Sequence, residues 1–436
     1  MSTSEVSIPL TPTQLTDVPP ELRVEFDVFD QSVYADVRKI MASFPPVCFT
    51  PANGGHWIVQ GYEPIREVAT DTDVFRSFPV ALPRNSYETR DRFIPIEVDP
   101  PQHADYRAII RPIFAPRTIN KLEPELVSLC DSLIDEFIEA GECEFMGQFA
   151  KRFPTTALLT LIGLPVSRLD EFNEWVDIFF FGLPEASEEE SNQARADVNR
   201  KITAFFGDFV DENIKAPKDN LMGTLITGTM PDGRRLSRAE MINFLFLLMA
   251  AGLHTVMGTL GFGALYFARD NEKRAAVLAD PALLPSAIEE ILRLEPVAWG
   301  TCRYVATDVE FGGVQMRAGD LVMIPWMTAN LDGERFDEPE EFRIDREANA
   351  HFSFGVGIHR CVGSHLARQE LQIAFERLLA RLPDFDVDPG KPLRGRMSQV
   401  RNIDELHLTF TPGPRVHDRA APWSDSERWR ISELRR

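Results

Sequence analysis

The chain has 436 residues, enough for roughly two or three average domains or for one large helical domain. Apolar residues make up 44% of it and charged residues 26%, which is typical of a folded protein with a substantial core and excludes a disordered chain. The formal net charge of -21 argues against nucleic acid and anionic membrane as partners, since both require positive potential. The 5 cysteines are widely spaced without a CxxC pair, which favours a reducing, cytoplasmic setting over a disulfide framework or a zinc site.

Residues 1–25 contain Thr, Ser and Pro but no apolar segment of signal-peptide type. We expect a loose leader there, without an export signal or membrane anchor. A single domain is expected over residues 26–411. It begins with a β-like segment at His56–Val59 and continues with mostly helical patterning from about Pro64 onward.

The segment 241–268 contains no Asp, Glu, Lys or Arg and is long enough to cross a bilayer. It includes Asn243 and several glycines, and nothing else in the chain looks adapted to a membrane. We therefore interpret it as the buried central helix of a water-soluble protein. Ser237 and Glu240, just before it, fit a capping box that marks where the helix begins.

The C-terminal half also contains short β elements. Residues 303–325 have the pattern of strands and turns punctuated by glycines, and residues 406–410 have the pattern of another strand. Residues 412–436 are expected to form a polar tail, in which Trp423 and Trp429 leave room for a docked surface segment. These patterns predict a mainly α fold with small β-sheets.

The most informative stretch is 354–363, Phe-Gly-Val-Gly-Ile-His-Arg-Cys-Val-Gly. Its first two glycines permit a tight turn, and Cys361 stands where an apolar helical pattern begins. Free N–H groups at the start of a helix lower the pKa of a thiol and favour a metal-bound thiolate. A buried structural cysteine is the alternative for Cys361 taken alone.

This stretch resembles the haem-binding loop of the cytochrome P450 family, Phe-Gly-x-Gly-x-His/Arg-x-Cys-x-Gly. The matching positions are Phe354, Gly355, Gly357, His359, Cys361 and Gly363. The resemblance implies the P450 fold, a triangular helical prism that holds haem b between the central helix and the helix after the cysteine. It implies that Cys361 is the axial ligand of the haem iron, that Phe354 packs beside the loop, that His359 bonds a propionate and that Gly363 lets the next helix lie against the ring.

Residues 251–255, Ala-Gly-Leu-His-Thr, resemble the oxygen-activation motif of the family, Ala/Gly-Gly-x-Asp/Glu-Thr. The resemblance implies that Ala251 and Gly252 leave room for dioxygen and water, and that Thr255 helps to deliver protons. His254 stands where the family usually has an acid; it could shuttle protons, serve substrate binding or only pack in the helix. A hydroxyl bonded back to its own helix is the alternative for Thr255.

Two further segments complete the resemblance. Residues 99–107 match a family segment that opens a helix beneath the haem, which implies that four basic groups neutralise the propionates. These are His103, Arg107, Arg303 and His359. Residues 290–293 match the Glu-x-x-Arg motif, followed by a Phe-x-x-Pro-x-x-Phe segment. The resemblance implies a buried structural network that holds the cysteine loop in place, with Glu290, Arg293 and Arg346 as its members.

Residues 54–58, 93–95 and 252–256 look like the camphor hydroxylase branch of the bacterial P450 enzymes. In the camphor enzyme a tyrosine two residues before Phe-Ile-Pro bonds the substrate, and here Asp91 takes that place, which argues against camphor itself. The expected pocket favours a compact hydrophobic molecule such as a monoterpenoid or norisoprenoid. Its lining residues are Phe93, Ile96, Leu247, Ala250, Leu253, Ala298 and Val400.

The function implied is a monooxygenase that inserts one oxygen atom from O2 into a C–H bond. No G-x-G-x-x-G follows a strand, so we expect electrons from a separate iron–sulfur ferredoxin and its NAD(P)H-dependent reductase. A docking patch for the ferredoxin is expected near the cysteine, formed by Arg107, Arg111, Arg360 and Arg368. Two alternatives are a peroxide-driven peroxygenase and a non-catalytic haem sensor with His254 or another residue on the oxygen side of the iron.

Overall fold

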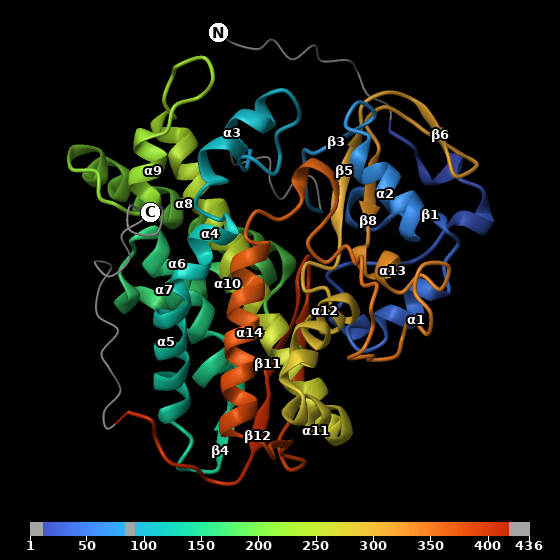
Figure 1. The fold of residues 1–436 in the computed structure, drawn as a ribbon. Coiled ribbons are helices and arrows are strands. Elements are labelled where there is room, and N and C mark those ends of the chain that lie inside the picture. The colour runs from blue at the N-terminus through green and yellow to red at the C-terminus, as the bar shows by residue number, and fades with distance from the viewer. Residues whose placement is uncertain (1–11, 83–91, 418–436) are drawn as a thin grey trace.

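The computed structural model describes residues 12–82 and 92–417, arranged as a helical body with a β-rich part beside it (Figure 1). This arrangement confirms the expected mainly α fold with small sheets. The helices are α1 (Val37–Ala42), α2 (Tyr62–Thr70), α3 (Gln102–Ile110), α4 (Pro116–Ile119), α5 (Glu123–Asp135), α6 (Arg152–Ile162), α7 (Leu169–Phe181), α8 (Glu188–Lys215), α9 (Leu221–Thr227), α10 (Arg238–Arg269), α11 (Asn271–Ala279), α12 (Leu284–Leu294), α13 (Trp326–Asn330) and α14 (Ser364–Arg381).

The largest sheet has the strand order β1-β2-β8-β5-β3. Its β2 and β8 run parallel, and the other neighbours run antiparallel. The predicted strand at His56–Val59 is β2, residues 303–325 contain strands as expected, and β12 lies within the predicted segment 406–410. The strands are β1 (Val47–Thr50), β2 (His56–Val59), β3 (Phe75–Arg76), β4 (Glu142–Glu144), β5 (Thr301–Val305), β6 (Val309–Phe311), β7 (Val314–Met316), β8 (Leu321–Ile324), β9 (Asp386–Val387), β10 (Arg394–Met397), β11 (Arg401–Glu405) and β12 (His407–Thr409).

Helix α10 runs through the centre of the helical body (Figure 1). The predicted capping box starts it, because Ser237 N donates to Glu240 Oε2 at 2.6 Å and Glu240 N donates to Ser237 Oγ at 3.3 Å. Among the described residues this helix alone has the length and mean hydropathy of a membrane span, yet 67% of its most apolar window is buried inside the protein. The interpretation of this segment as a buried central helix is therefore confirmed.

Close packing around α10 depends on its small residues. A Cβ added at Gly263 would lie 2.2 Å from Cζ of Phe375, which belongs to α14. Phe375 lies in the second half of α14, so this contact packs that half of the helix against the C-terminal part of α10. Any larger residue at position 263 would push the two helices apart.

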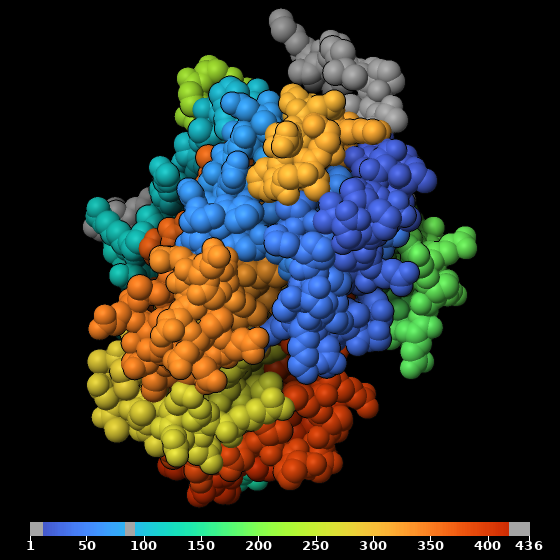
Figure 2. Space-filling model, turned by 90° about the vertical axis from the view of Figure 1, so that its right-hand side faces the viewer, coloured from blue at the N-terminus to red at the C-terminus, as the bar shows by residue number. Residues whose placement is uncertain are grey.

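Both ends of the described chain are attached to the fold. Thr13 donates from N to Asp320 Oδ1 and from Oγ1 to Oδ2, both at 2.7 Å, and Val18 is buried. The part of the expected loose leader that the structure describes is thus packed against the fold. Figure 2 shows the dark blue N-terminal part of the chain lying against the orange part that contains β6 and β7. At the other end the N–H groups of Val416 and His417 donate to Asp135 at 2.9 Å. The remainder of the expected leader and tail, with Trp423 and Trp429, lies outside the described residues.

Candidate active site

The cysteine loop, residues 354–363, contains two glycines in the left-handed region, Gly355 with φ +67° and Gly357 with φ +77°. A Cβ added at Gly357 would lie 3.1 Å from Cγ2 of Thr70 and 3.3 Å from the carbonyl oxygen of Ala69. The loop therefore needs glycine there for two reasons, the backbone conformation and the close approach of α2. The turn closes with a hydrogen bond from the N–H of Cys361 to the carbonyl of Phe354 at 2.8 Å.

The thiol of Cys361 differs from the other four cysteine thiols of the chain. Cys361 is exposed, and the others are buried. Protein nevertheless encloses Cys361 on most sides, so that burial raises its pKa, while the N–H of Gly363 and then the charges of Arg107 and Arg360 lower it only in part. Our prediction of a lowered pKa is wrong for the free thiol, because burial outweighs the helix start. A bound metal cation would reverse this balance and deprotonate the sulfur.

Four basic residues, drawn from three parts of the chain, gather near the cysteine loop. They are His103, Arg107, Arg303 and His359. The rings of His103 and His359 lie 4.4 Å apart between centroids, and His359 Nε2 pairs with Ser77 Oγ at 2.8 Å. Arg107 Nη2 donates to the carbonyl of Arg360 at 2.8 Å. The structure thus brings together the four groups that the sequence predicted to neutralise two propionates.

This basic cluster is poorly compensated. Arg303 is 3% exposed, and its Nη1 donates to the carbonyl of Cys302. Burial lowers the pKa of Arg303 to about 10 and that of His103 to about 4. Burial and then the charge of Arg303 lower the pKa of His359 to about 2. Nε2 of His103 is buried and has no hydrogen-bond partner among the described residues. Such a cluster fits a ligand with two carboxylates, as haem b has.

The glycine that follows the cysteine supports the same ligand. Within 4 Å, a Cβ added at Gly363 would meet only Sγ of Cys361, at 3.9 Å. The backbone of Gly363 has φ -82°, which any residue adopts, so neither strain nor a protein neighbour demands glycine here. An added methyl group would instead fill the space beside the sulfur. The residues present therefore fit a flat haem group bound at Cys361.

One strip in the middle of α10 is uncovered, although most residues around it along the helix are buried. Ala251 is exposed and Thr255, one turn later, is half-buried. Oγ1 of Thr255 donates to the carbonyl of Ala251 at 2.9 Å, the back-bond we considered as the alternative for this residue. A Cβ added at Gly252 would lie 2.5 Å from Cδ2 of Leu158, so this glycine allows α6 to approach closely. Only Ala251, and not Gly252, leaves space on the uncovered strip.

His254 points away from that strip. It is completely buried, and its ring lies 5.7 Å and 5.9 Å from the rings of Phe180 and Phe181 between centroids. Burial lowers the pKa of His254 to about 4, although the charge of Asp177 opposes this shift. At neutral pH the ring is therefore an uncharged group packed against α7.

The predicted network of Glu290, Arg293 and Arg346 is present and fully bonded. Glu290 is completely buried and accepts from Arg293 Nη2 at 2.6 Å and Nε at 2.8 Å, and from Arg346 Nε at 3.1 Å. Arg293 also donates to the carbonyl of Asn330 at 2.9 Å. Asn330 in turn bonds Ser353 Oγ at 2.8 Å, directly before the cysteine loop. A chain of hydrogen bonds thus links the network to this loop.

The sequence did not predict a second support of the loop. Glu289 accepts both guanidinium donors of Arg368, at 2.6 Å and 2.7 Å, and pairs with His351 Nε2 at 3.1 Å. The guanidinium of Arg368 lies 4.5 Å from the ring centroid of Phe354. Arg368 is therefore engaged in holding Phe354, which weakens its expected place in a docking patch. Arg111 and Arg360 are exposed.

The seven expected lining residues differ in how much of their surface is exposed. Ile96, Leu247 and Ala298 are partly accessible, whereas Phe93, Ala250 and Val400 are each 4% exposed. Leu253 has no exposed surface. The prediction for Leu253 is wrong, because the helical repeat turns it about 160° away from Thr255 and into the helix packing. Asp91 lies outside the described residues.

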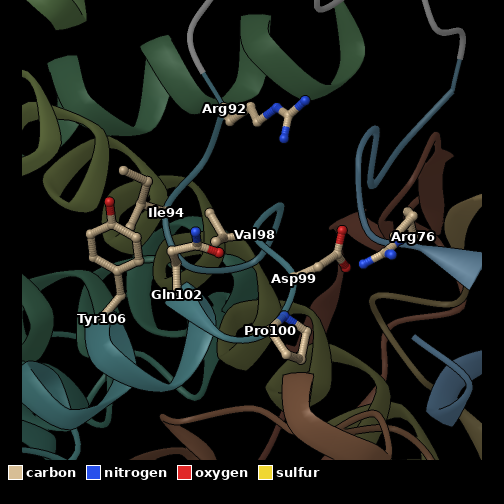
Figure 3. Close-up of a pocket in the computed structure, with 8 residues that line it drawn as sticks. All are labelled: Arg76, Arg92, Ile94, Val98, Asp99, Pro100, Gln102 and Tyr106. Carbon is tan, nitrogen blue, oxygen red and sulfur yellow. The ribbon is translucent and has the colours of Figure 1, made fainter. Parts of the chain in front are cut away.

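The sequence also missed a pocket of about 420 Å³ at the start of α3 (Figure 3). Figure 3 shows the side chains of Arg76 and Asp99 pointing toward each other, with Arg92 across the hollow. Its lining residues are Arg76, Arg92, Ile94, Val98, Asp99, Pro100, Gln102 and Tyr106. Ile94 and Val98 neighbour the expected lining residues Phe93 and Ile96 along the chain, so the pocket adjoins the predicted substrate region.

Comparison with known proteins agrees with this geometry. A sequence model of the cytochrome P450 family matches residues 158–403. Cytochrome P450 107B1 of Saccharopolyspora erythraea is 36% identical over 365 residues, which cover 80% of this chain and 88% of the relative. The steroid C26-monooxygenase of Mycolicibacterium smegmatis is 33% identical over 322 residues, which cover 74% and 80%.

Solved structures show the same fold. The crystal structure of CYP101J2 has a TM-score of 0.81 at 29% identity and covers 92% of this chain and 100% of that one. A mutant of P450 EryK in complex with erythromycin B has a TM-score of 0.80 at 27% identity and covers 90% and 100%. The expected P450 fold and haem b as the cofactor are thereby confirmed. The chain belongs to the cytochrome P450 family, and the expected enzyme class, a P450 monooxygenase, is thereby confirmed.

Proposed function

We propose that this chain is a monooxygenase that hydroxylates a compact hydrophobic molecule of the terpenoid or norisoprenoid class, with O2 and electrons from a ferredoxin. The observation that carries the proposal is the exposed thiol of Cys361 beside a buried basic cluster. We assign Cys361 as the axial ligand of the haem iron. We assign the cluster as the site that holds the two propionates by charge-assisted hydrogen bonds.

When bound, thiolate-ligated haem supplies the activation of dioxygen, because the sulfur pushes electron density to the iron and favours O–O cleavage. The protein supplies position and protons. Thr255 offers a hydroxyl on the uncovered strip of α10, and its back-bond to Ala251 fixes where the oxygen of that hydroxyl lies. The networks of Glu290 and Glu289 keep the cysteine loop rigid.

The substrate class follows from the partly accessible apolar residues. Ile96, Leu247 and Ala298 offer apolar, uncharged contacts suited to a compact hydrophobic molecule. One relative named above is a steroid C26-monooxygenase, and another curated relative is named a vitamin D(3) 25-hydroxylase. A larger polycyclic molecule is therefore the second candidate. Screening both classes for shifts in the haem spin state separates them.

Electron supply is proposed to come from an iron–sulfur ferredoxin with an NAD(P)H-dependent reductase, in the cytoplasm. The exposed Arg360 offers positive charge close to the cysteine, and the exposed Arg111 adds charge beside Arg107, in a chain with a net negative charge. The sensor alternative loses support, because the ring of His254 is buried between Phe180 and Phe181 instead of facing the uncovered strip.

Reconstitution tests the proposal. The purified haem protein should hydroxylate a member of the terpenoid or norisoprenoid set when ferredoxin, reductase and NAD(P)H are supplied. Turnover with peroxide alone at an equal rate would favour the peroxygenase alternative. Failure of both electron sources, with a thiolate-type haem spectrum intact, would contradict a monooxygenase acting on this substrate class.

A further inference from the structure

The pocket at the start of α3 combines cationic and apolar side chains. Its volume is about 420 Å³, and its lining includes the half-buried Arg76 at the end of β3 and the exposed Arg92 directly before Phe93. Ile94 and Val98 supply apolar surface in the same hollow. The pocket therefore offers positive charge and apolar contacts to a single ligand.

Arg76 lacks a partner for its charge. Its guanidinium forms no hydrogen bond or ion pair with any residue that the structure describes. Figure 3 shows Asp99 directed toward it, but this carboxylate is shared: its Oδ1 accepts from the N–H of Ser77 at 3.1 Å. The charge of Asp99 also acts on His103 and Arg303, where it opposes the lowering of their pKa values by burial. Arg76 is thus only partly neutralised, and an anion in the pocket would complete its surroundings.

Arg92 lies across the hollow from Arg76 (Figure 3). Its guanidinium carbon is 4.6 Å from the ring centroid of Phe78, a cation–π contact. Phe78 follows Arg76 by two residues, so this contact ties Arg92 to the segment that carries the first arginine. The two cations therefore flank one hollow and are attached to one another through a short piece of chain.

The charge of the lining matches a monoanion. Among the lining residues the two arginines and Asp99 leave one positive charge, which suits a carboxylate better than a doubly charged phosphate ester. A guanidinium also presents parallel N–H donors that fit the two oxygens of a carboxylate. The apolar side chains of the lining require an apolar body on the same molecule. The ligand that satisfies both conditions is a hydrophobic carboxylic acid.

The pocket is distinct from the two parts of the site already described. None of the four basic residues assigned to the propionates is among its lining residues, and no lining residue belongs to α10. Ile94 and Val98 nevertheless lie next to the expected substrate contacts Phe93 and Ile96 along the chain. A carboxylate held here would leave the apolar end of the molecule to reach the uncovered strip that carries Thr255.

We propose that Arg76 and Arg92 bind the carboxylate of a hydrophobic acid and thereby direct hydroxylation to the end of the substrate remote from that carboxylate. The carboxylate stays ionised and takes no part in the reaction, and the arginines only position the molecule. This inference rests on the proposed function, and it narrows the substrate class to terpenoid or norisoprenoid acids.

The first test measures binding without turnover. A set of monoterpenoid acids that includes perillic acid, each paired with its methyl ester, is titrated into the ferric holoenzyme and followed by calorimetry and by the haem spin state. We expect the native protein to bind the acids more tightly than their esters. Arg76→Met and Arg92→Met should each weaken acid binding about tenfold or more and leave ester binding unchanged. Equal affinity for acids and esters in the native protein would overturn the inference.

Two controls separate this site from other effects of charge. Arg66→Met removes the same charge from α2, where Arg66 pairs with Glu63 at 2.6 Å and does not line the pocket. Acid binding that fell equally in this control would reveal a general electrostatic effect and overturn the site. Faster transfer of haem from Arg76→Met to an acceptor globin would place Arg76 at the propionates, which would also contradict the inference.

Product analysis is the second test, and its outcomes distinguish the two proposals. We expect native protein to hydroxylate an acid away from the carboxylate and Arg76→Met to give mixed positions; hydroxylation beside the carboxylate in native protein would contradict the inference. Hydroxylation of neutral terpenoids without a preference for acids would overturn the inference and leave the monooxygenase intact. Tight binding of acids without hydroxylation would refute the proposed function and leave the carboxylate site intact.

Discussion

Replacing Glu290 by glutamine should destabilise the protein strongly without creating a cavity, because the two side chains have almost the same volume. Glu290 is completely buried and accepts hydrogen bonds from Arg293, Arg346, Asn349 and the N–H of Arg343. Glutamine would turn its amide N–H groups toward these donors and leave two buried guanidinium charges uncompensated. Breaking one partner of a buried ion pair costs about 3–5 kcal/mol.

The assay is urea unfolding of the haem protein, followed by circular dichroism and by haem absorption. We expect the unfolding free energy of Glu290→Gln to fall by about 3–5 kcal/mol, with earlier release of haem, because the network reaches the cysteine loop through Asn330 and Ser353. The matched control is Glu63→Gln. Glu63 also pairs with an arginine three residues later, but its side chain is 65% exposed.

The control should lose no more than about 1 kcal/mol, as surface ion pairs do. Both substitutions remove one carboxylate from an i,i+3 ion pair. The difference between their losses of unfolding free energy therefore measures the effect of burying the pair. If Glu290→Gln cost as little as Glu63→Gln, the reasoning from buried charge would be refuted. Loss of stability without earlier haem release would refute the link to the cysteine loop.

Three further predictions concern pH and haem retention. Burial lowers the pKa of His56 to about 4, below the unfolded value of about 6.5. Stability should therefore fall as pH drops from about 6.5 toward 4, and His56→Gln should remove up to about 3 kcal/mol of that loss in urea titrations at several pH values. Gly357→Ala should release haem faster than Gly233→Ala, because both have positive φ but a Cβ at 233 meets nothing within 4 Å. Arg303→Met should speed haem transfer to an acceptor globin about tenfold or more, because the haem would lose one charge-assisted hydrogen bond. An unchanged rate of transfer would show that Arg303 does not belong to the propionate site.

Local patterns made much of the site predictable. The glycines of the cysteine loop are required by backbone conformation, so residues 354–363 carry their structural reason in the sequence itself. The capping box is equally local, since Ser237 and Glu240 lie three residues apart. The central helix was recognisable from its unbroken apolar composition. The network around Glu290 was predicted only because a Glu-x-x-Arg motif is followed by the Phe-x-x-Pro-x-x-Phe segment that accompanies it in the family.

Features that depend on tertiary packing could not be predicted in the same way. Glu289, His351 and Arg368 come from separate parts of the chain, and no spacing links them. The raised pKa of Cys361 depends on burial, which the sequence of a loop does not contain. Leu253 was misplaced because in a helix that is buried on nearly all sides, apolar composition does not tell which face is open.

The most direct measurement is the absorption spectrum of the reduced carbon monoxide complex, in the native protein and in two cysteine variants. We expect a thiolate-type band in the native protein and in Cys130→Ala, whose thiol is buried elsewhere, and loss of that band in Cys361→Ala. A thiolate-type band that survives in Cys361→Ala would contradict the assignment of this residue as the iron ligand.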